Sequence, residues 1–200
     1  MPYEYSAQNH DWDMTLYAAA ELIKAGLIAD RRPKTGNMSM GFSFFTGGMV
    51  LSFAAVESFS ASVAFTMPST PGYETFDFKA YQSARRFWDK MTILCSAAGI
   101  VADKSQGLFQ RIEQMQQWRN LVTHAQPFEI EPTVIQSTAK EPGKLHKKHH
   151  RKDYLRSAEP EPARLFYRTA VEYIDLLKEK TGIDPRASAS YRVLGEPTHG

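Results

Sequence analysis

The feature that most constrains this chain is a 39-residue window, Thr35 to Tyr73, in which Glu57 is the only charged residue. Its central part, Gly47 to Met67, is long enough to span a bilayer. That part also carries four serines and the glutamate, and a charge at bilayer depth is costly. We therefore expect no membrane insertion. Instead, a helix over about Ser39 to Phe65, apolar nearly all round, should lie at the centre of a soluble bundle.

Further segments of the chain show helical periodicity. They cover about Asp11 to Ala29, Asp77 to Ala98, Lys104 to Ala125 and Pro162 to Lys180. Glycine or proline lies just beyond each expected helix end. The sequence thus predicts an all-α fold, an up-and-down helical bundle of four to five helices with short connections and one long polar excursion.

The length of 200 residues and a hydrophobic fraction of 42% fit one globular domain. We expect this domain at residues 1–182, with a basic loop excursion at 128–160 and a C-terminal tail at 183–200. A single cysteine, Cys95, excludes an internal disulfide. Together with an N-terminus that lacks the pattern of a secretory signal, it favours a reducing cytoplasm. Cys95 lies among apolar residues and is expected in the core.

The formal net charge of +2 does not discriminate between partners, because the distribution of charge matters more. Seven Lys or Arg and two acids lie between Lys140 and Arg156. This segment would attract an RNA backbone without regard to sequence, or would simply be a solvated loop. Its histidines have no accompanying Cys or carboxylate pattern, so we predict no metal site and no cofactor.

The fourth expected helix ends in the motif Arg119-Asn120-Leu121-Val122-Thr123-His124. Arg119 falls within the apolar stripe of this helix, where a guanidinium needs an anionic partner. Asn120 lies four residues before His124, so its amide can reach the imidazole. Imidazole can move a proton at a ribose 2′-hydroxyl, and a guanidinium can hold a phosphate. The alternative is that Arg119 and His124 only cap carbonyls and complement the helix dipole.

The two outer residues of this motif point in different directions. Arg119 and His124 lie about 140° apart on a helical wheel, so one helix cannot easily aim both at one phosphate. Two copies related by a two-fold axis can do so. We therefore expect a homodimer with the motif at its interface.

Glu57, on the expected central helix, should be either neutral or paired. The candidate partners are Arg119, Arg85 and Arg86. Glu57 would either orient Arg119 and take part in proton transfer, or form a buried structural salt bridge. Arg85 and Arg86 would flank an RNA groove or lie on a solvated helix face.

The Arg-Asn-x-x-x-His motif follows a Ser/Ala-rich helix with one glutamate, Ala54 to Phe59, and this combination resembles the HEPN superfamily over roughly residues 40 to 127. The resemblance implies a dimeric helical bundle and, in active members, metal-independent RNA cleavage that leaves a 2′,3′-cyclic phosphate. By position, Arg119 and His124 would be the active pair. Gln126 stands where one toxin subgroup has tyrosine, so the tyrosine modification of that subgroup is not expected. Other members keep the bundle without cutting RNA.

The first functional hypothesis is a cytoplasmic, HEPN-like endoribonuclease that acts on single-stranded RNA as a homodimer. As a toxin or antiviral effector it would have a cognate antitoxin or regulatory protein. The alternative is a non-catalytic helical dimer that binds RNA, a nucleotide or a partner protein. A third hypothesis is a purely structural subunit. The predicted site comprises catalytic Arg119, His124, Asn120 and Glu57, and RNA-binding Arg85, Arg86, Lys147, Lys148, Arg151 and Lys152.

Overall fold

A computed structural model describes residues 4–7, 10–31, 40–123, 158–188 and 191–194. Within these ranges the chain is all-α, as predicted, apart from two four-residue strands. The helices are α1 (Trp12–Ala29), α2 (Phe42–Thr66), α3 (Phe78–Ser83), α4 (Phe87–Ala97), α5 (Gly107–Thr123) and α7 (Pro160–Thr181). Single 3₁₀ turns, Met67–Ser69 and Pro185–Ser188, follow α2 and α7.

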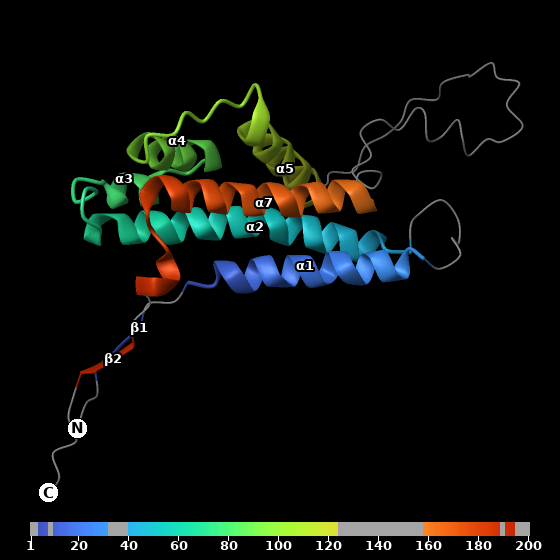
Figure 1. The fold of residues 1–200 in the computed structure, drawn as a ribbon, viewed down its shortest axis with the longest axis horizontal. Helices are drawn as coiled ribbons and strands as arrows, with labels where there is room; N and C mark the ends of the chain where they lie inside the picture. The colour runs from blue at the N-terminus through green and yellow to red at the C-terminus, as the bar shows by residue number, and fades with distance from the viewer. Residues whose placement is uncertain (1–3, 8–9, 32–39, 124–157, 189–190, 195–200) are drawn as a thin grey trace, which may run out of the picture.

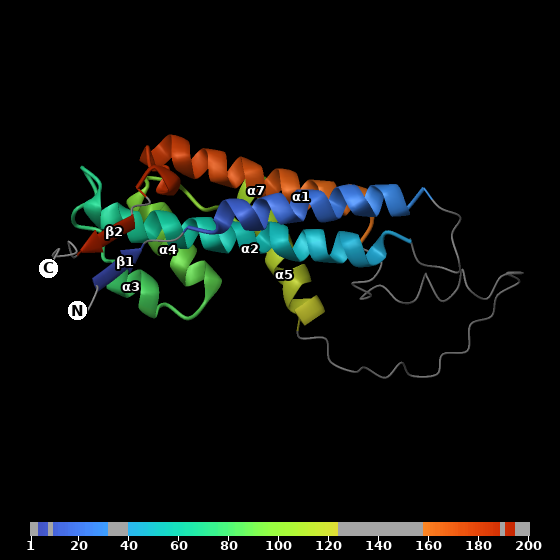
Figure 2. The same cartoon turned by 90° about the horizontal axis from the view of Figure 1, so that it is seen from below.

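The four longest helices differ in direction along the bundle. In both ribbon views α1 runs one way and α2 and α7 run the other, while α5 crosses them steeply (Figures 1 and 2). The helices α3 and α4 lie beside α2 on the side away from α1. The helices α1, α2 and α7 thus run up and down the bundle as expected, α5 crosses them, and α2 lies between α1 and α5.

The central position of α2 follows from its composition. Twelve of its residues are buried, from Phe45 to Ala64, so it contributes more buried residues than any other helix within the described ranges. By length and composition alone, Phe42–Ser69 would also suffice to cross a membrane, and 56% of its most apolar window is buried inside the protein. The prediction of a central core helix is confirmed.

Glycines allow α1 and α2 to approach closely. A Cβ atom on Gly48 would lie 2.5 Å from Ile23 Cγ1 and 3.2 Å from the Ala19 carbonyl oxygen. A Cβ atom on Gly26 would lie 2.6 Å from the ring of Phe45. Larger residues at these positions would force the two helices apart.

The single helix predicted over 77–98 is two helices in the structure. Asp77 caps α3 by accepting a hydrogen bond from the backbone N–H of Ala80, and the backbone becomes extended at Ala84 and Arg86 before α4 begins. Tyr81 of α3 and Met91 of α4 are both buried, so each of the two short helices packs a large side chain into the core.

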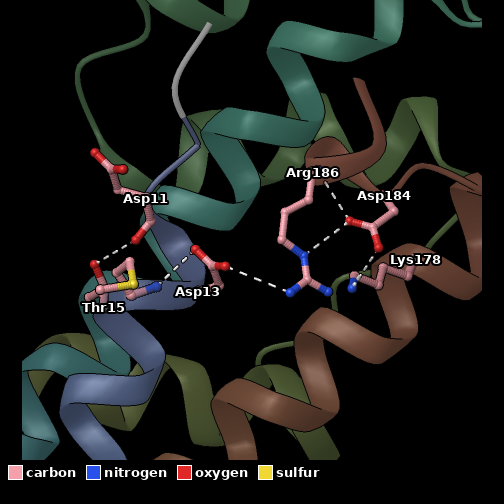
Figure 3. Close-up of polar contacts among 7 residues, drawn as sticks. Asp11, Asp13, Thr15, Lys178, Asp184 and Arg186 are labelled. Atoms are coloured by element: carbon pink, nitrogen blue, oxygen red, sulfur yellow. Dashed lines mark hydrogen bonds and ion pairs between the residues drawn. The ribbon is translucent and has the colours of Figure 1, made fainter. Parts of the chain in front are cut away.

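The segment after α7 returns to the bundle. Gly182 ends the helix in the left-handed conformation, with φ +68°, as its position predicted. Asp184 then lies 3.4 Å from Lys178 and 3.6 Å from Arg186, and Arg186 lies 3.7 Å from Asp13 at the start of α1 (Figure 3).

An aromatic ring and a strand pair complete this end of the molecule. Lys178 and Arg186 lie 4.9 and 5.1 Å from the centre of the Trp12 ring, and Ile183 is buried. Strands β1 (Glu4–Ala7) and β2 (Tyr191–Leu194) then pair antiparallel. The expected tail at 183–200 is therefore wrong for residues 183–188, because cation–π contacts, ion pairs and apolar burial hold this segment on α1. Residues 191–194 form a strand that pairs with β1.

Candidate functional site

The helix α5 positions Arg119 at the edge of its core-facing surface. Its buried side chains are Phe109, Ile112, Met115 and Trp118, three residues apart. From the sequence, Leu108, Ile112, Met115 and Val122 are expected to form the apolar stripe of this helix. The structure buries Ile112 and Met115, leaves Leu108 and Val122 half-buried, and adds the two aromatic residues. Arg119 follows Trp118 by one residue, or about 100° on the helix. Its side chain is 25% exposed.

The expected carboxylate partner of Arg119 is present. Arg119 Nη2 donates a hydrogen bond to Glu57 Oε1 at 2.8 Å, and the Glu57 side chain is 39% exposed. Of the three arginines considered from the sequence, the structure places Arg119 against Glu57. The prediction that Glu57 contacts an arginine is confirmed.

An aromatic ring also contacts the Arg119 guanidinium. Phe53 lies four residues before Glu57 and therefore on the same face of α2. The Arg119 Cζ atom lies 5.0 Å from the centre of its ring, within cation–π distance. Phe53 in turn packs on Phe87 of α4, with 5.0 Å between ring centres. Three helices thus fix the surroundings of one guanidinium.

The electrostatics of Glu57 combine opposing effects. Burial raises the pKa of its carboxyl, and the charge and hydrogen bond of Arg119 and the charge of Lys90 offset part of this rise. Tyr81 lies close by, and burial together with the charge of Glu57 raises the pKa of its phenol. The Lys90 ammonium lies 5.5 Å from the centre of the Tyr81 ring.

Two cations therefore act on Glu57, Arg119 from α5 through an ion pair and Lys90 from α4 through its charge. A guanidinium carries five N–H donors, so one bond to a carboxylate leaves it capacity for a second anion. This arrangement can hold a phosphate or carboxylate group at the exposed edge of α5. Sequence analysis found Glu57 and Arg119 but missed Phe53, Tyr81 and Lys90. The spacing of Phe53 from Glu57 was the one available signal.

The remaining predicted residues fall into two groups. Asn120 is exposed on α5, and Arg85 and Arg86 are exposed at the junction of α3 and α4. The structure does not bring these three residues into the ion pair of Glu57 and Arg119. The other predicted residues lie outside the described residues, namely His124, Lys147, Lys148, Arg151 and Lys152.

The expectation for Cys95 is confirmed. Its side chain is buried in the core, and burial raises the pKa of the thiol to about 12. A thiol with so high a pKa is a poor nucleophile. Among the residues that the structure describes, no three His, Cys, Asp or Glu side chains are grouped so that they could hold a metal ion.

Comparisons with known proteins identify no relative: no family model matches the chain, and no curated protein or solved structure is significantly similar to it.

Proposed function

We propose that this protein is a metal-independent endoribonuclease of the HEPN type that cleaves single-stranded RNA as a homodimer. The observation that carries the proposal is the placement of Arg119, which Glu57 and Phe53 hold on α5 five residues before His124. A guanidinium fixed before substrate arrives is preorganised to bind a phosphate and its developing charge.

In the proposed reaction, the 2′-hydroxyl oxygen of a ribose attacks the adjacent phosphorus. His124 removes the proton of that hydroxyl, and the same or the symmetry-related imidazole returns a proton to the leaving 5′-oxygen. Arg119 binds the non-bridging phosphate oxygens, and Asn120 orients the imidazole. The products are a 2′,3′-cyclic phosphate and a 5′-hydroxyl. Glu57 is a positioning residue, since it acts through Arg119.

The dimer follows from the geometry of the motif. On a helical wheel that continues to His124, the directions of Arg119 and His124 would differ by about 140°, so we propose that each shared cleft receives Arg119 from one copy and His124 from the other. The exposed Arg85 and Arg86, with Lys147, Lys148, Arg151 and Lys152, would attract the RNA backbone.

The test is cleavage of a single-stranded RNA by the purified full-length chain in EDTA, with detection of the cyclic phosphate end. We expect His124→Ala to reduce cleavage by about a hundredfold to ten-thousandfold and Arg119→Ala to reduce it by about a hundredfold or more. Arg111→Ala is the matched control. It removes another α5 arginine, whose partner is Glu172 at 2.6 Å, and it should leave cleavage unchanged.

Two results would overturn the proposal. RNA binding that weakens steeply with salt, without any cleavage, would favour the non-catalytic RNA-binding alternative. Cleavage, or toxicity on overexpression, that survives both Arg119→Ala and His124→Ala would show that the activity lies elsewhere.

A further inference from the structure

The helix α1 has two different faces. One face packs into the core through Trp12, Ala19, Ile23 and Gly26. The opposite face carries exposed large apolar side chains, because Met14 is 65%, Tyr17 63% and Ile28 55% exposed. Met14 and Tyr17 lie about one helical turn apart, and Ile28 lies about three turns further along the same face, beyond Glu21 and Lys24. The face therefore has apolar side chains at both ends and charges in the middle.

The exposed residues of this face follow a regular spacing. They are Met14, Tyr17, Glu21, Lys24 and Ile28, which are separated by three, four, three and four residues. This is the spacing of the seam in a two-stranded coiled coil. We call Met14, Tyr17, Glu21, Lys24 and Ile28 the α1 seam. Ala18 and Ala25 flank it, and such small side chains allow a second helix to approach closely.

The α1 seam is complementary to itself in only one orientation. If a second α1 lies antiparallel, with its Lys24 opposite Glu21, then its Ile28 lies opposite Tyr17 and its Arg31 lies opposite Met14. By two-fold symmetry each pairing occurs twice. A parallel pair would instead place Glu21 against Glu21 and Lys24 against Lys24, which is unfavourable.

We propose that α1 is a homodimerisation surface on which a second copy of this chain packs antiparallel through the α1 seam. Tyr17 and Ile28 from each copy would leave water together, and Glu21 and Lys24, which lie 3.7 Å apart within one helix, would form a network of four charges across the two-fold axis. Apolar burial would supply most of the affinity, and the charges would fix the orientation.

This inference is independent of the ribonuclease proposal. The ribbons place α1 and α5 on opposite sides of α2 (Figures 1 and 2), so the α1 seam and the Arg119 face are different surfaces. A chain that uses both contacts would form an assembly larger than a dimer. A chain that uses only the α1 seam would form a dimer whose two copies of Arg119 lie far from the interface.

The test compares charge reversals by light scattering after size exclusion and by sedimentation. We expect Glu21→Lys and Lys24→Glu to weaken the association by about tenfold or more, because each places like charges opposite one another. Loss of the association should halve the molecular mass that both methods measure. The double variant E21K/K24E exchanges the two charges in both copies and should restore the association. Glu179→Lys, an exposed reversal on α7, is the matched control and should have no effect.

An apolar variant provides a second measurement. Ile28→Asp should also halve the mass, whereas Val101→Asp, at a side chain that is 86% exposed and outside α1, should not. The circular dichroism of each variant should match that of the original chain, since all the substitutions are exposed. A monomeric original chain would overturn the inference. So would an association that both single reversals leave intact, because the copies would then meet through another face, such as that of Arg119.

Discussion

Arg119 on α5 and Glu57 on α2 lie 62 residues apart in the sequence and 2.8 Å apart in the structure. Their ion pair is partly exposed, at 25% and 39% of the side chains, so it is neither a buried structural bridge nor a solvated surface contact. The Phe53 ring covers the guanidinium from one side. The pair therefore restricts the arginine while one edge of it stays open to an anion.

The energy of this pair is the first prediction. A double-mutant cycle with Glu57→Gln and Arg119→Met should give a coupling free energy of about 0.5–1 kcal/mol, the range of partly exposed pairs. The measurement is urea unfolding of the four chains. A cycle between Glu57→Gln and Arg111→Met is the control and should give about zero, because Arg111 pairs with Glu172. Equal coupling in both cycles would contradict a direct interaction.

The pH dependence of stability is the second prediction. Burial raises the pKa of Glu57 above its ordinary value of 4.5, so the folded state holds this proton more tightly than the unfolded state. The contribution of Glu57 to the free energy of unfolding should therefore fall as pH rises from 4.5 through the raised pKa, and then stay constant. Since the side chain is 39% exposed, the fall should not exceed about 1 kcal/mol.

The measurement for this prediction is urea unfolding of the original chain and Glu57→Gln between about pH 4 and about pH 7. The free energy of unfolding of the original chain, relative to the variant, should decrease with rising pH. An increase would mean that Arg119 and Lys90 outweigh burial and hold the pKa below its ordinary value.

The contact between α1 and α2 gives the third prediction. Gly48→Ala should destabilise the fold by about 1–3 kcal/mol, since the added Cβ would lie 2.5 Å from Ile23 Cγ1 and 3.2 Å from backbone oxygen. Gly47→Ala is the neighbouring control. Its Cβ would meet only the end of the Leu22 side chain, at 3.0 Å, and alanine favours helix by up to about 1 kcal/mol. Thermal unfolding compares the two, and equal losses would show that helix packing is not the cause.

Local chemistry in the sequence determined most of the secondary structure. The window from Thr35 to Tyr73 predicted a central helix because, with Glu57 as its only charge, it has no polar face to turn toward water. Gly182 ended α7 because only glycine adopts the left-handed conformation without cost. A lone carboxyl on a core helix is either neutral or paired, and both roles considered for Glu57 predicted contact with an arginine.

Only the tertiary structure decided which cation that was. A helical wheel gives the direction of a side chain around its own helix axis. It does not show which residue of another helix lies opposite that side chain. Packing of α5 against α2 selected Arg119 over Arg85 and Arg86 and placed its guanidinium over the Phe53 ring. Packing of α4 brought the charge of Lys90 to act on the same carboxylate.

The return of residues 183–188 to α1 depends on tertiary contacts. Local propensity favours a loose end after Gly182. Burial of Ile183 and the ion pair of Arg186 with Asp13 reverse that preference. Those gains exist only once distant segments are in contact, so no local pattern in the sequence could reveal them.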